Sequence, residues 1–103
     1  MENYIKFKKE LNKKFMEFLK KNDTHSLSGY ISFGKIEQKP IKLNYYGDDY
    51  DTIIDMIYID NEDEIIVENH FEYNGETIND TTPFTHFNND EMKEIMKLCN
   101  AEY

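Results

Sequence analysis

Residues 60–77 read DNEDEIIVENHFEYNGET, and the order of turn and strand signals in this stretch decides the fold. Turn-forming residues open it at Asp60 to Asp63, and Asn74-Gly75, a strong hairpin signal, closes it. Between the two turns four odd positions, Ile65, Val67, Phe71 and Tyr73, are apolar. Because successive side chains of a strand point to opposite faces, this alternation predicts a strand over 64–73 with one buried face.

The segments around this strand predict further strands of an antiparallel sheet. Residues 52–59 (TIIDMIYI) are apolar at odd and even positions, which is typical of a central strand covered on both faces or of one at a protein interface. Alternation also predicts a strand over 41–45, with a turn at Gly47-Asp48-Asp49. A short strand at 76–78 and another at Leu27, Ile31 and Phe33 complete the set of candidates.

Helical periodicity frames the strands. Residues 2–22 place one apolar stripe at helical spacing, made of Tyr4, Phe7, Leu11, Phe15, Phe18 and Leu19. Near the other end, Asn88 and Glu91 predict a capping box, and Phe87 with Met92 predicts a hydrophobic staple. We therefore expect a single α+β domain over 1–103: an N-terminal helix packed across a four- to five-stranded antiparallel sheet, and a C-terminal helix.

Length and composition limit the class of protein. With 103 residues the chain is near the commonest size of one domain. The single cysteine, Cys99, excludes an intramolecular disulfide and falls on the apolar face of the last helix, where we expect a core residue. No apolar run has the length of a signal sequence core or a membrane span, so we expect a cytoplasmic protein.

Charge is divided unevenly along the chain. Residues 1–42 contain ten Lys and five acidic residues, whereas residues 43–103 contain two Lys and sixteen acidic residues. The chain has no Arg, and its net charge is −9. One interpretation is self-complementation, with a basic helix near an acidic sheet edge. The other is a surface that attracts a basic partner.

The acidic strand supplies the candidate binding site. The even positions Glu64, Glu68, His70 and Glu72 share one face, on which alternate residues lie ~6.6 Å apart, a spacing comparable to that of DNA phosphates. Such a row could occupy a basic groove, and tyrosines would add contact area. The competing interpretation is a solvated face that keeps a small protein soluble. The predicted partner-binding residues are Glu62, Asp63, Glu64, Glu68, His70, Glu72, Tyr73, Glu76, Asp48, Asp49 and Tyr50.

Other chemistry finds little support in the sequence. No stretch fits a calcium loop, and His25, His70 and His86 have no zinc-like spacing with each other or with Cys99. Nucleophile, phosphate-loop and dinucleotide signatures do not occur. Acidity disfavours direct nucleic-acid binding, and acidic residues interrupt the Lys-rich face of the first helix, which disfavours a membrane surface. We therefore expect no enzyme activity, no metal and no cofactor.

These observations favour a non-enzymatic acidic binding protein, an inhibitor or immunity-type protein that occupies a basic surface of a nucleic-acid-handling partner. In size and charge the chain is similar to anti-CRISPR and anti-restriction proteins of phages and mobile elements, and to nuclease immunity proteins. That similarity covers composition only, so no residue roles follow from it. The alternatives are a self-associating structural module, dimerising through the strand around Ile53, Ile57 and Ile59, and a small-ligand-binding domain or enzyme.

Overall fold

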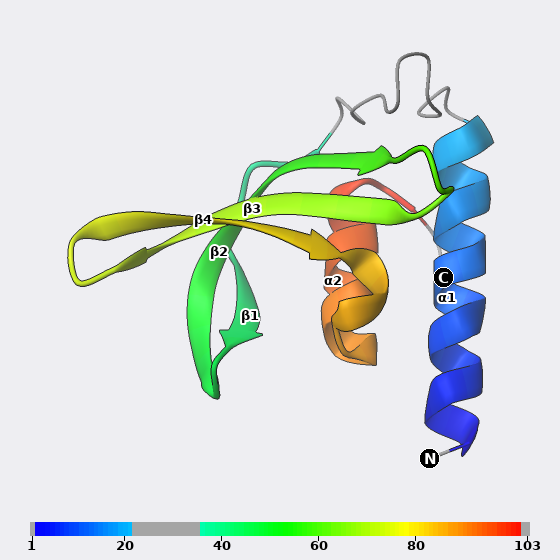
Figure 1. Cartoon of the computed structure of the whole chain (residues 1–103), viewed down its shortest axis with the longest axis horizontal. Helices are drawn as coiled ribbons and strands as arrows, with labels where there is room; N and C mark the ends of the chain where they lie inside the picture. Colours follow the sequence, from blue (N-terminus) through cyan, green and yellow to red (C-terminus); the bar gives the residue numbers. More distant parts are fainter. Residues whose placement is uncertain (1, 22–35, 102–103) are drawn as a thin grey trace.

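The computed structural model describes residues 2–21 and 36–101 and confirms the predicted α+β fold (Figure 1). The predicted strand at Leu27, Ile31 and Phe33 lies outside the described residues. Within the described residues, two α-helices accompany one antiparallel sheet, and a short 3-10 helix precedes the second α-helix. In chain order the elements are α1 (Glu2–Lys21), β1 (Ile41–Tyr45), β2 (Asp48–Ile59), β3 (Ile65–Tyr73), β4 (Glu76–Pro83), η1 (Phe84–His86) and α2 (Asn89–Leu98).

The described strands form one sheet in the order β1-β2-β3-β4, and each neighbouring pair is antiparallel. Two-residue turns close the first and last hairpins. Their φ angles are positive at both residues, 55° and 93° at Tyr46-Gly47 and 50° and 80° at Asn74-Gly75. This is the geometry that matches the twist of hairpin strands. The first turn therefore comes earlier than the predicted Gly47-Asp48-Asp49, and Asp48 and Asp49 belong to β2.

A bulge in β2 explains why its sequence is apolar at both odd and even positions. The register with β3 shifts between Ile54 and Met56, so one extra residue is inserted at Asp55. Before the bulge Thr52 and Ile54 are buried, and after it Ile57 and Ile59 are buried. The buried positions of β2 therefore change from even-numbered to odd-numbered at the bulge, while the same face of the strand stays toward the core. The expectation of a strand packed alike on two faces is corrected accordingly, although Tyr58 on the opposite face is also buried.

The second helix, α2, covers the sheet, and α1 packs beside it (Figure 1). We call the sheet face under α2 the inner face and the opposite one the outer face. Only η1, Phe87 and Asn88 separate β4 from α2, so the chain has to turn back directly under the sheet. α1 contacts α2, η1 and the end of β2. The expectation that the first helix lies across the sheet was therefore wrong.

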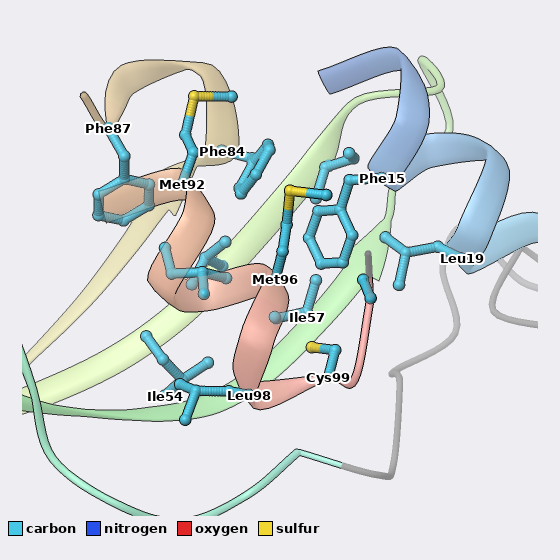
Figure 2. Close-up of a cluster of buried hydrophobic side chains, with 14 of the residues drawn as sticks. Phe15, Leu19, Ile54, Ile57, Phe84, Phe87, Met92, Met96, Leu98 and Cys99 are labelled. Carbon is cyan, nitrogen blue, oxygen red and sulfur yellow. The ribbon is translucent and has the colours of Figure 1, made fainter. Parts of the chain in front are cut away.

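The core lies between the inner face and the two helices. Figure 2 shows Phe15 of α1 pointing toward Met96 of α2, and its ring centroid is 4.7 Å from that of Phe84. Cys99 is buried in the same cluster, as predicted, and burial raises the pKa of its thiol to about 12. Only the C-terminal half of the α1 stripe is buried, at Leu11, Phe15 and Leu19. In its N-terminal half Tyr4, Ile5 and Phe7 are exposed, and the Nζ of Lys93 of α2 lies 4.9 Å from the centre of the Phe7 ring.

The predicted capping box at the start of α2 is confirmed and has a second role. The Asn88 side chain accepts a hydrogen bond from the Glu91 backbone N–H at 2.8 Å, and Glu91 Oε1 accepts from the Asn88 N–H at 2.9 Å. The other carboxylate oxygen, Oε2, accepts from the Asn44 N–H at 2.7 Å. One carboxylate therefore caps the helix and also ties α2 to β1.

Candidate functional site

The sheet divides into two hairpin arms beyond its centre. Pairing between β2 and β3 runs from Ile59↔Ile65 to Thr52↔Phe71 and stops there. The remainder of β2 pairs only with β1, as far as Tyr45↔Asp48, and the remainder of β3 only with β4, as far as Tyr73↔Glu76. We call residues 41–52 the first arm and residues 71–78 the second arm. Figure 1 shows their tips pointing in different directions.

A pocket of about 350 Å³ lies between the arms. Both arms contribute to its walls, the first through its turn and the start of β2, the second through β3 and β4. The lining residues are Tyr46, Asp48, Tyr50, Phe71, Tyr73 and Ile78. Since Phe71 pairs with Thr52 at the last β2–β3 contact, it lies where the arms separate.

Aromatic rings from both arms pack together at this junction. The Phe71 ring stacks on Tyr45 with centroids 4.4 Å apart and lies 4.7 Å from the Tyr50 ring. Tyr73 meets Tyr50 edge to face, with centroids 6.1 Å apart. Phe71 is buried, whereas Tyr73 is 50% exposed and Tyr46 is fully exposed at the hairpin tip. The pocket therefore has a fixed aromatic base and accessible aromatic sides.

Two of these phenols are held in the neutral form. Desolvation, then the charge of Asp48 and the neighbouring Tyr73, raises the pKa of Tyr50 above its ordinary value of 10.0. Burial, then the charges of Asp80 and Glu91, raises the pKa of Tyr45 further. The Tyr45 hydroxyl donates a hydrogen bond to Oδ1 of the buried Asn69, whose amide nitrogen donates to the Val67 carbonyl at 3.2 Å. Asn69 is thus satisfied inside the sheet.

The predicted partner-binding residues fall on two faces. Glu68, His70 and Glu72 of β3 lie on the outer face, since the alternate β3 residues are buried under α2. Tyr73, on the inner face, lines the pocket together with Asp48 and Tyr50, and Glu76 pairs with Tyr73. Asp49 is exposed on β2, and Glu62, Asp63 and Glu64 lie in or beside the β2–β3 turn. The predicted residues therefore do not form one continuous acidic surface, because they are divided between the two faces of the sheet and the β2–β3 turn.

Some of these charges have partners within the chain. Asp63 forms an ion pair with Lys20 at 3.4 Å, which joins the end of α1 to the β2–β3 turn. His70, which Glu68 and Glu72 flank on the outer face, has its Nδ1 2.8 Å from the carboxylate of the bulge residue Asp55. Thr77 Oγ1 donates to Glu72 at 2.7 Å. Self-complementation therefore exists, but Lys20–Asp63 is the only ion pair between α1 and residues 60–77.

The residues of the predicted dimer contact have different surroundings. Ile57 and Ile59 are buried in the core between the sheet and the helices, and only Ile53 lies partly exposed on β2. Three residues of the pocket, Tyr46, Phe71 and Ile78, were not among the predicted site residues. Phe71 reads in sequence as an ordinary core position, and only the end of β2–β3 pairing reveals its place between the arms.

Resemblance to known proteins assigns no function to the chain. No protein-family model, curated protein or solved structure matches the chain. Within residues 2–21 and 36–101, no three His, Cys, Asp or Glu side chains are grouped so that they could hold a metal ion. The described helices include none long and apolar enough to cross a membrane.

Proposed function

We propose that the chain is a non-enzymatic cytoplasmic binding protein that uses its acidic sheet to occupy a basic surface of a nucleic-acid-handling protein, as anti-CRISPR, anti-restriction and nuclease immunity proteins do. The observation that carries the proposal is the surplus of carboxylates on the two arms and the outer face. Glu68, Asp48 and Glu76 form no ion pair with any described residue. The chain as a whole retains a net charge of −9.

A sheet suits this role because it holds its charges at fixed positions. Glu68 and Glu72 project from the same face of β3, and Thr77 holds Glu72 by a hydrogen bond. A fixed carboxylate loses less conformational freedom on binding than one on a flexible loop, and opposite charge speeds the encounter with a basic partner. Exposed tyrosines on the same sheet, Tyr46 and Tyr73, add the amphipathic contact area that is common in interfaces.

The test is affinity capture from host lysate at low and high salt, followed by titration of the purified partner. Glu68/Glu72→Lys changes the charge of the outer face, and Asp48/Glu76→Lys changes that of the arms. Glu10/Glu17→Lys is the matched control, since it reverses two exposed charges of α1 and alters the net charge equally. We expect a basic nucleic-acid-binding partner that is retained at low salt and released at high salt.

The expected pattern is specific to the sheet. Each sheet variant should weaken binding about tenfold or more, because a reversed charge repels the basic partner, whereas the α1 control should change it by less than about threefold. Equal losses in all three variants would indicate a response to net charge alone and contradict the proposal. Failure to retain any basic partner at low salt would contradict it too.

A further inference from the structure

We propose that the pocket between the two arms receives the guanidinium group of an arginine side chain presented by the partner protein. This inference rests on the proposed function and names the chemistry that the arms recognise. It adds an occupied pocket to the acidic surface, so the partner would be held by one inserted side chain as well as by charge attraction.

The shape and lining of the pocket fit a flat cation. Its base is the buried Phe71 ring, and Tyr50 and Tyr73 meet nearly at right angles beside it, with an interplanar angle of 77°. Ring faces attract cations, and a guanidinium also stacks on them because it is planar. A volume of about 350 Å³ is at the small end for ligand pockets and suits one long side chain.

The charge around the pocket has the matching sign. Among the described residues that line it, Asp48 is the single carboxylate and none is a Lys. Glu76 pairs with Tyr73 in the register of the second arm, so it adds a second carboxylate at the edge. A carboxylate beside aromatic rings offers a guanidinium both a hydrogen-bond acceptor and stacking surfaces.

A second pocket on the molecule has aromatic and aliphatic lining, but its described lining residues lack the negative charge found between the arms. It lies on the exposed half of α1, has a similar volume of about 400 Å³, and also contains aromatic and aliphatic side chains. However, Lys8 and Lys9 line it, and the Lys8 Nζ already lies 5.6 Å from the centre of the Tyr4 ring. A cation from a partner would meet repulsion there and attraction between the arms.

The experiment is an NMR titration of the full chain with N-acetyl-arginine amide, compared with N-acetyl-citrulline amide. Citrulline has nearly the same shape but carries no charge. We expect the arginine probe to shift the signals of Tyr50, Phe71 and Tyr73 with millimolar affinity, and the citrulline probe to bind about tenfold more weakly.

Two pairs of variants test the residues. Asp48→Asn should weaken arginine binding about fivefold, whereas Asp49→Asn, its exposed neighbour outside the pocket, should leave it within about twofold. Tyr73→Leu should weaken it about fivefold, and Tyr4→Leu, another exposed tyrosine, should not. Circular dichroism of each variant establishes that the fold is retained.

Several results would overturn the inference. These are equal shifts from both probes, shifts that map to α1 or to the outer face, or no effect of Asp48→Asn. Tighter binding of tetramethylammonium than of the arginine probe would indicate a site for small cations instead. Partner capture that depends on Glu68 and Glu72, without arginine binding between the arms, would overturn this inference and leave the proposed function intact. Arginine binding between the arms without any basic partner would contradict the proposed function and the role of a partner in this inference, and would leave only the guanidinium chemistry of the pocket.

Discussion

The two hairpin arms have the same turn geometry but are built from different residues. Both turns have positive φ at both central positions. Asn74-Gly75 is the dipeptide that this geometry favours, whereas Tyr46-Gly47 places a bulky side chain where it is disfavoured, at a cost of about 1 kcal/mol or more. The residues of the second turn therefore adopt this geometry without backbone strain. The first keeps a fully exposed tyrosine beside the pocket at the expense of stability.

The two arms also differ in how they are attached to the rest of the protein. The first arm is tied to α2 by the hydrogen bond from the Asn44 N–H to Glu91, and the Lys42–Asp51 ion pair at 2.7 Å joins its own two strands. The second arm has the Glu72–Thr77 hydrogen bond across its own strands. The strained turn thus belongs to the first arm, which is hydrogen-bonded to α2. One side of the pocket is formed by this arm, and the other side is formed by the second arm, which is stabilised by contacts within its own hairpin.

Removing the ring that joins the arms should have the largest effect on stability. Phe71 is 4% exposed, stacks on Tyr45 and packs at a tilt against Tyr50 of the first arm. Phe71→Ala should lower the free energy of unfolding by about 3–5 kcal/mol, because it removes a buried ring and leaves a cavity. Urea denaturation measures the change. Tyr73→Ala, at a half-exposed position two residues away, should cost much less, and an equal cost would show that Phe71 is no special junction.

The hydrogen bond between Tyr45 and Asn69 should come next. Tyr45→Phe keeps the ring stacked on Phe71 but leaves the buried Asn69 Oδ1 without its donor. We expect a loss of about 1–3 kcal/mol in the free energy of unfolding. The double variant Tyr45→Phe/Asn69→Leu removes both polar partners and should be less destabilised than the sum of the two single variants. Additive losses would show that the two groups do not act as a pair.

The same tyrosine predicts how stability changes in alkali. Burial raises the pKa of Tyr45 above its ordinary value of 10.0, so the folded state keeps a proton that the unfolded chain releases above that pH. The contribution is complete below pH 10 and declines as the pH rises further. The wild type should lose about 1 kcal/mol more than Tyr45→Phe between pH 10 and 11. Parallel pH profiles of the two proteins would contradict the raised pKa.

The features that were predicted correctly from the sequence depend on residues that are close together in the chain. Alternation over 64–73, the Asn74-Gly75 turn and the Asn88 capping box each depend on neighbouring residues, and each is present in the structure. The bulge at Asp55 and the separation of the arms depend on where one strand stops pairing with the next. No short pattern encodes that end point, so the parity change in β2 and the position of Phe71 were missed.

The candidate site shows the same limit. Asp48, Tyr50 and Tyr73 were predicted to act together and do line one pocket. The same predicted set contained Glu68 and Glu72, which the alternation over 64–73 placed on the face opposite Tyr73, as the structure confirms. The face of Asp48 and Tyr50 was not predicted. Charge and aromatic content can be counted from a sequence. The face to which each side chain belongs depends on strand register, and here also on a bulge.

The glycines of the two turns provide a matched comparison of the arms. A Cβ at Gly47 or at Gly75 would meet no other atom within 4 Å, and the φ angles are 93° and 80°. Replacement by Ala therefore changes only the backbone preference, and each substitution should cost about 1 kcal/mol. Thermal unfolding measures both. A clearly smaller cost at Gly47 would show that the first turn relaxes from this geometry in solution.

The smallest expected effect is a gain in stability. Tyr46→Asn puts the favoured residue into the first turn and should raise the free energy of unfolding by about 0.5–1 kcal/mol, which corresponds to a few degrees in Tm. The reciprocal change, Asn74→Tyr, should lower it by a similar amount. Because Tyr46 also lines the pocket, Tyr46→Asn should weaken binding of the arginine probe while it stabilises the fold. A variant that gains stability and keeps full binding would show that the strained tyrosine has no part in recognition. One that loses both would show instead that the Tyr46 ring supports the first arm itself.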